Sequence, residues 1–185
     1  VGQGNTSDCE VIANASVYPL DSLALANEYA DRELPGLPRL LSEAGYHTLT
    51  IHANEIEFWN RDELYPALGF DEYLDESAFG EGEIIGIGYS DTQLYELAAT
   101  TLAEKTADGT PVYESLITLT SHHPFVLPEQ YQTLDLPADI EGTLVGHYLQ
   151  SMHYNDARIG ELVTALDETG LFEDSVIAVY GDHFG

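Results

Sequence analysis

The sequence is poor in basic residues. Only 5 of its 185 residues are Lys or Arg, against 33 Asp or Glu, and the formal net charge is −28. This balance excludes nucleic-acid binding by simple phosphate neutralisation, and it excludes a basic membrane-surface module. Like charges at this density repel one another unless salt screens them. We therefore expect a halophilic protein, with an ordinary acidic secreted protein as the alternative.

Cysteine and long apolar runs are also scarce. The single cysteine, Cys9, cannot form an internal disulfide, and no Cys/His zinc pattern accompanies it. The longest apolar runs, such as residues 176–180, are far shorter than the ~20 residues that cross a bilayer. The first residues do not have the pattern of a signal peptide, and the sequence does not begin with Met. We expect both ends to be internal to a longer protein.

The apolar residues that are present alternate between helical and strand periodicity. They predict helices at residues 37–44, 61–68, 92–105 and 143–168, strands at 46–51, 114–119 and 175–180, and loops at 77–88 and 130–141. The last strand is almost continuously apolar, as a strand buried on both faces should be. Strands separated by helices predict an α/β fold, with a mainly parallel central sheet and helices on both faces.

Polar residues follow each predicted strand, and their types suit ligand binding: His52 and Asn54, then Ser121 and His122, then Asp182 and His183. Sites in parallel sheets form beyond the carboxyl ends of the strands. If the three strands are neighbours, these side chains meet at one edge. The sequence therefore predicts a functional site there.

The pair Asp182 and His183 combines a carboxylate with an imidazole, which suits Zn²⁺ or Mn²⁺. The alternative is a turn-capping Asp beside a surface His.

Near the start of the chain, Ser7 and Glu10 match a capping box, so a helix is expected to begin there. Thr6 would then lie at a helix N-terminus, which favours anions such as phosphate. Its alternative role is as part of the cap.

The only tryptophan, Trp59, lies next to a scarce arginine, Arg61, whose planar guanidinium matches phosphate oxygens. The alternative is a core Trp59, with Arg61 paired to Asp62 or Glu63. His122 could donate a proton or a hydrogen bond to a phosphate or leaving group, or it could be an ordinary turn histidine.

Taken together, these segments resemble the extracellular catalytic domain of lipoteichoic acid synthases, in the sulfatase-like branch of the alkaline phosphatase superfamily. Within the matching stretches, Gly4-Asn5-Thr6-Ser7 lies near the start of the chain, Phe58-Trp59-Asn60-Arg61 follows, and Gly181-Asp182-His183 comes near the end. The stretches are residues 2–8, 14–19, 51–54, 58–62, 119–125, 148–154 and 179–185, in the family's order. The resemblance implies an alkaline phosphatase/sulfatase-like sheet, truncated at both ends.

The resemblance also implies roles for these residues. Thr6 corresponds to the nucleophile that takes glycerophosphate from phosphatidylglycerol and passes it to a polyglycerolphosphate or glycolipid acceptor. Thr6, Asp182 and His183 correspond to ligands of one divalent metal, Mn²⁺ foremost, with Mg²⁺ or Zn²⁺ as alternatives. The substrate-binding residues it implies are Trp59, Arg61, His122, His52 and Asn54. His122 could also protonate the departing diacylglycerol oxygen.

The same resemblance implies that residues 1–185 are an internal fragment of an extracellular catalytic domain in a membrane-anchored enzyme. The membrane helices, a first strand ending in a metal-binding Glu, and the C-terminal part would lie outside it. We expect the fragment alone to be inactive.

Other readings stay open. A phosphoglycerol transferase acting on glucans would share these motifs. A true sulfatase needs Cys/Ser-x-Pro-x-Arg, and the residues after Cys9 lack both Pro and Arg. A non-catalytic ectodomain that binds anionic glycopolymer is the third alternative.

Overall fold

The computed structural model of the chain describes residues 4–19 and 24–183. Its α-helices are α1 (Thr6–Ala15), α2 (Leu25–Tyr29), α3 (Leu37–Glu43), α4 (Arg61–Leu68), α5 (Asp91–Lys105) and α6 (Leu144–Glu168). Its strands are β1 (His47–His52), β2 (Glu72–Leu74), β3 (Ile84–Ile85), β4 (Gly88–Tyr89) and β5 (Val112–Ile117). Single 3-10 turns lie at Phe58–Asn60, Glu76–Ala78, Glu129–Tyr131 and Phe172–Asp174.

The central sheet is parallel, with β1 between β2 and β5. Leu49 of β1 lies opposite Glu72 on one side and Glu114 on the other. Helix α4 connects β1 to β2, and α5 precedes β5, as parallel strands require crossover connections. The short strands β3 and β4 form a separate antiparallel hairpin.

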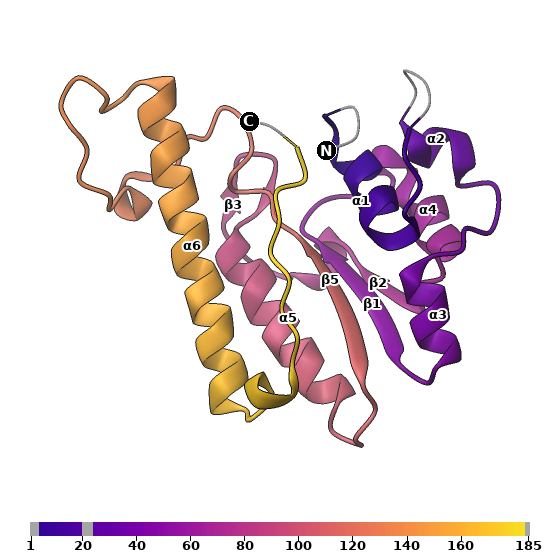
Figure 1. The fold of residues 1–185 in the computed structure, drawn as a ribbon. Helices are drawn as coiled ribbons and strands as arrows, with labels where there is room; N and C mark the ends of the chain where they lie inside the picture. The colour runs from indigo at the N-terminus through magenta and orange to yellow at the C-terminus, as the bar shows by residue number, and fades with distance from the viewer. Residues whose placement is uncertain (1–3, 20–23, 184–185) are drawn as a thin grey trace.

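Helices cover both faces of the sheet (Figure 1). On one face, Leu49 and Ile51 pack against Leu94 and Ala98 of α5, and α6 packs on the outside of α5. Helices α1–α4 cover the other face, over a core made of Val11, Leu25, Ala26, Leu34, Leu64, Tyr65, Leu68 and Phe70. The α/β fold with a parallel sheet is confirmed.

The structure confirms the helices predicted at 37–44, 61–68, 92–105 and 143–168, each to within one residue at either end. It also confirms the first two predicted strands, to within two residues at either end. The loop predicted at 77–88 is only partly right, because this region contains strand β3 and the first residue of β4.

The strand predicted at 175–180 is wrong. Among the residues that the structure describes, this segment pairs with no other strand. It is also exposed: Val176 is 99% accessible and Val179 is 68% accessible. Its apolar pattern fits a buried strand, but a strand exists only where a neighbour completes the hydrogen-bond ladder. Pattern alone does not supply that neighbour.

Candidate active site

A cavity of about 160 Å³ lies beyond the carboxyl ends of β1 and β5. Its walls come from the start of α1, the end of β1, the 58–61 turn, the β3–β4 hairpin, the loop after β5 and the end of the described chain. The lining residues are Gly4, Asn5, Thr6, His52, Phe58, Trp59, Arg61, Ile87, Leu119, His122 and His183. A larger, more open hollow between α5 and α6 is lined by Ala, Thr and Glu only, so it lacks the mixed donors of a catalytic site.

Thr6 is the first residue of α1, at the cavity wall. The cap is Asn5 rather than the predicted Ser7: the Asn5 Oδ1 accepts the Asp8 N–H and the Ser7 hydroxyl, both at 2.9 Å. The predicted capping box is therefore wrong, although the position of the helix start is right. The first backbone N–H groups of a helix have no partner within it, so negative charge is favoured beside Thr6.

Arg61, the first residue of α4, is 1% exposed and borders the cavity. Its Nε lies 3.1 and 3.2 Å from the two carboxylate oxygens of Glu10, and its Nη2 lies 3.0 Å from Oε2. The alternative in which Asp62 or Glu63 pairs with Arg61 is wrong, because Glu10 of α1 takes that place. Sequence reasoning assigned Glu10 to a cap, and no local spacing could have linked positions 51 residues apart.

The backbone turns sharply just before Arg61. Trp59 and Asn60 both have left-handed conformations, with φ of 63° and 55°. Such consecutive non-glycine residues are strained and persist only where the surroundings hold them. Here the Asn60 Nδ2 donates to the Ala26 carbonyl at 3.2 Å. The turn brings Trp59 and Arg61 to the same cavity wall.

His52, the last residue of β1, is 2% exposed at the cavity. Burial lowers the pKa of His52 to about 3, and the nearby Arg61 charge adds to this effect. The imidazole is therefore neutral at physiological pH. Its Nδ1 lies 3.4 Å from the Ile117 carbonyl, which can only accept, so Nδ1 carries the proton and Nε2 keeps its lone pair.

Asn54 does not line the cavity, unlike the other predicted binding residues. Its Nδ2 donates to the Ile87 carbonyl at 3.0 Å. Nearby, Gly88 passes so close to the Ala53 carbonyl that a Cβ would lie 2.3 Å from the oxygen. These two contacts hold the β3–β4 hairpin, and with it Ile87, over the cavity.

His122 is exposed in the loop after β5, and its Nδ1 donates to the His123 carbonyl at 2.9 Å. Asp91, at the start of α5, fixes the base of this loop: its Oδ1 accepts the N–H groups of Leu119 and Thr120 at 2.9 and 3.1 Å. Burial raises the pKa of Asp91. Sequence reasoning missed Asp91, because its partners belong to a distant loop.

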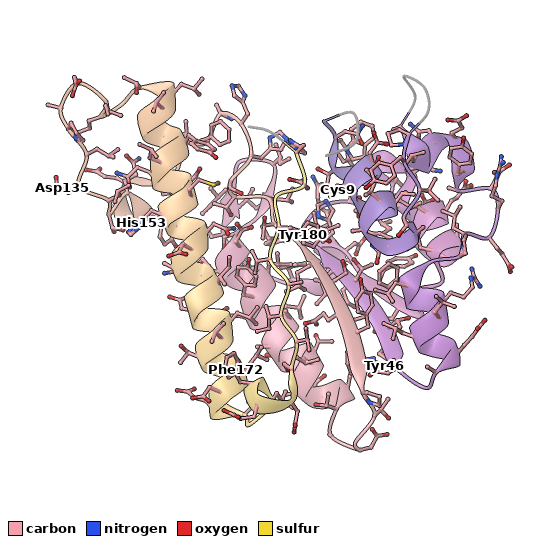
Figure 2. All side chains as sticks on the ribbon, viewed as in Figure 1. Cys9, Tyr46, Asp135, His153, Phe172 and Tyr180 are labelled. Carbon is pink, nitrogen blue, oxygen red and sulfur yellow. The ribbon has the colours of Figure 1, made fainter. Side chains whose placement is uncertain are left out.

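His183 also lines the cavity, so the structure brings the two ends of the described chain together. Its ring centroid lies 6.4 Å from that of His122. Tyr180, in the segment that leads to His183, lies near Cys9 of α1 (Figure 2), and the pKa of Tyr180 is raised by partial burial and by Cys9 and Glu10. Asp182 adds to the effect of burial in raising the pKa of Cys9, so its carboxylate lies close to the same helix.

The donor types at this end suit a divalent metal. Asp182 offers a carboxylate, His183 an imidazole and Thr6 a hydroxyl. Across residues 4–19 and 24–183, however, no three His, Cys, Asp or Glu side chains are grouped to hold a metal ion. The described residues thus fit a metal by type but supply fewer protein ligands than a closed structural site.

Comparison with known proteins finds similar chains among lipoteichoic acid synthases. The lipoteichoic acid synthase of Staphylococcus saprophyticus is 34% identical over 187 aligned residues, which cover all of this chain and 28% of that protein. The crystal structure of the lipoteichoic acid synthase LtaP from Listeria monocytogenes superposes with a TM-score of 0.91 at 38% identity, over 94% of this chain and 43% of that one.

A more distant fold neighbour is the Streptococcus pyogenes phosphoglycerol transferase GacH in complex with sn-glycerol-1-phosphate. Its TM-score is 0.68 at 17% identity, over 91% of this chain and 46% of that one. The chain spans less than a third of the length of the curated relatives that it matches. The resemblance to lipoteichoic acid synthases is confirmed. The sulfatase family model matches residues 7–185, and the chain belongs to that family.

Proposed function

We propose that this chain carries the glycerophosphate-transfer site of a lipoteichoic acid synthase-like phosphoglycerol transferase. The observation that carries the proposal is the single cavity that gathers Thr6, His52, Trp59, Arg61, His122 and His183. A hydroxyl at a helix N-terminus, a guanidinium and several imidazoles around one small cavity suit a phosphate diester better than an uncharged substrate. The lipoteichoic acid synthases named above support the same activity.

In the proposed reaction, the Thr6 Oγ attacks the phosphorus of phosphatidylglycerol. The bond from Thr6 Oγ to phosphorus forms, the bond to the diacylglycerol oxygen breaks, and the hydroxyl proton ends on diacylglycerol. A terminal hydroxyl of the acceptor, a polyglycerolphosphate chain or a glycolipid, then forms a bond to phosphorus as the bond to Thr6 Oγ breaks, and the acceptor's hydroxyl proton ends on Thr6. The intermediate is a glycerophosphoryl ester of Thr6.

The other cavity residues would hold the headgroup. Arg61 and the α1 N-terminus would donate hydrogen bonds to the phosphoryl oxygens. Neutral His52 can accept a hydrogen bond from a glycerol hydroxyl through Nε2. Trp59 would cover the glycerol, and His122 would hydrogen-bond a phosphoryl or leaving-group oxygen. Asn54 would not contact the headgroup itself; its hydrogen bond to the Ile87 carbonyl would hold Ile87 at the cavity wall.

Asp182, His183 and the Thr6 hydroxyl would hold one divalent cation, Mn²⁺ foremost. When bound, that ion would lower the pKa of the Thr6 hydroxyl and stabilise charge on the phosphoryl group. A further protein ligand, outside the described set, would complete the site.

We further propose that the chain is part of an extracellular catalytic domain in a membrane-anchored enzyme, since its relatives are several times longer. Within the described residues, no helix has the length and apolarity to span a bilayer. Membrane attachment would therefore come from other parts of the enzyme.

The test is diacylglycerol release from fluorescent phosphatidylglycerol with Mn²⁺, by the intact enzyme that contains this sequence. Thr6→Ala should abolish release, and so should a chelator, with Mn²⁺ restoring activity in the second case. The matched control is Thr100→Ala, the same change on an exposed turn of α5, which should keep wild-type rates. Release that survives Thr6→Ala would rule out the covalent route.

A further inference from the structure

Glu10 is a buried carboxylate that the proposed reaction does not use. It lies on α1, one turn after Thr6, and is 7% exposed. Three groups surround it: the Arg61 Nε at 3.1 and 3.2 Å, the Arg61 Nη2 at 3.0 Å, and the Tyr65 hydroxyl, which donates to Oε1 at 2.8 Å. Tyr65 is 2% exposed, so the whole cluster is inside the protein.

The hydrogen bonds of Arg61 leave part of the guanidinium available. A guanidinium has five N–H groups. Glu10 accepts the Nε–H and forms an ion pair with Nη2 at 3.0 Å, and the Phe58 carbonyl accepts one N–H of Nη1 at 2.9 Å. Within the described part of the chain, the remaining N–H of each terminal nitrogen has no protein acceptor, and Arg61 borders the cavity. A phosphate there could take both.

The pair also links two parts of the site. Thr6 and Glu10 are four residues apart on one helix, so they lie on the same helix face. Arg61 begins a different helix, after the strained turn at Trp59 and Asn60. The bidentate pair fixes the guanidinium relative to the helix that carries the Thr6 hydroxyl. It also cancels most of the Arg61 charge, so Arg61 acts through aimed donors more than through net charge.

We propose that Glu10 is a positioning residue: with help from Tyr65, it holds Arg61 so that the two remaining N–H groups face the phosphoryl oxygens in the cavity. The inference rests on the proposed function. For removal of the Glu10 charge, positioning and simple electrostatics predict opposite changes in anion affinity. Removing the Glu10 charge makes the site more positive, which by charge alone would tighten anion binding. If positioning dominates, binding weakens.

The experiment compares Glu10→Gln with wild type in the intact enzyme, measuring KM and kcat for phosphatidylglycerol and the affinity for glycerol phosphate by calorimetry. We expect about tenfold weaker affinity and a similar rise in KM, the size of one lost charge-assisted hydrogen bond. Asp62→Asn is the matched control: the same charge change, next to Arg61 but exposed, should leave both values unchanged.

Unchanged or tighter binding in Glu10→Gln would overturn the proposal, and so would a lower kcat at constant KM, which marks a merely structural loss. Tyr65→Phe keeps the charges of Glu10 and Arg61, so it tests the proposal if Glu10→Gln does not fold. It should raise KM about threefold alone and add nothing in the Glu10→Gln background, whereas full additivity would contradict a shared role. A wild-type enzyme without diacylglycerol release would instead refute the proposed function, which separates the two failures.

Discussion

The two sides of the cavity differ in what holds them in place. The Arg61 side (α1, the end of β1 and residues 58–65) contains a buried and densely hydrogen-bonded cluster, in which Glu10, Arg61, Tyr65 and His52 are all nearly inaccessible. The C-terminal segment (residues 175–183) is extended and largely exposed, and it joins no sheet among the described residues. Yet it brings His183 to the same cavity. The proposed phosphate-binding groups are thus held in place by packing, whereas two of the proposed metal ligands, Asp182 and His183, lie at the end of an exposed segment that no strand pairs with among the described residues.

The largest expected difference is in stability. Arg61→Leu leaves the Glu10 carboxylate buried with only Tyr65 as a partner, which should cost about 3–5 kcal/mol of the free energy of unfolding. Val176→Ser, in the C-terminal segment, should change it by less than about 0.5 kcal/mol because Val176 is already exposed. Urea unfolding of both variants measures this contrast. Equal losses would show that the two sides share one packed core.

An intermediate effect is expected at Glu114, on the edge strand β5. Its Oε1 is buried without a hydrogen-bond partner, and burial raises the pKa of Glu114 to about 8. A carboxyl whose pKa is raised on folding destabilises the fold as pH rises, here from about 4.5, its ordinary value, to about 8.

Glu114→Gln should therefore add about 3 kcal/mol of stability at pH 7 and flatten the pH dependence between those limits. Thermal unfolding from pH 4 to pH 8 measures this. The matched control is Glu104→Gln, the same change on α5 at an exposed position. A variant no more stable than wild type at pH 7 would show that Glu114 is charged and solvated.

The smallest expected effect concerns the whole surface. With a net charge of −28, self-repulsion opposes folding, and molar salt shortens the screening length to about 3 Å. The melting temperature should therefore rise from low salt to molar NaCl. Because the Arg61–Glu10 ion pair is buried, salt should weaken it less than it weakens the repulsion between surface charges. A flat melting temperature would contradict adaptation to high salt.

Sequence reasoning predicted the fold where local pattern decides it. The helix α4 begins and ends as predicted because its apolar face and Gly69 are local signals. The strand predicted at 175–180 has no such local signal. An apolar run becomes a buried strand only where another strand pairs with it, and the run itself does not show whether that partner exists.

The site divides in the same manner. Thr6, Trp59, Arg61 and His183 each belong to a short local motif that the sequence displays, and all four line the cavity. The sequence does not reveal Glu10 and Asp91 as site residues, because their partners lie 51 and 28 residues away and side-chain contacts at that range leave no periodic pattern. Asn54 was grouped with the pocket by its place after β1, but its side chain turns to the hairpin instead.

The most direct test of the central claim is mass spectrometry of the intact enzyme, quenched during turnover of phosphatidylglycerol without acceptor. The account predicts one glycerophosphoryl adduct on the peptide that contains Thr6, absent from Thr6→Ala and lost when acceptor is added. Turnover with no adduct, or an adduct on any other residue, would contradict it.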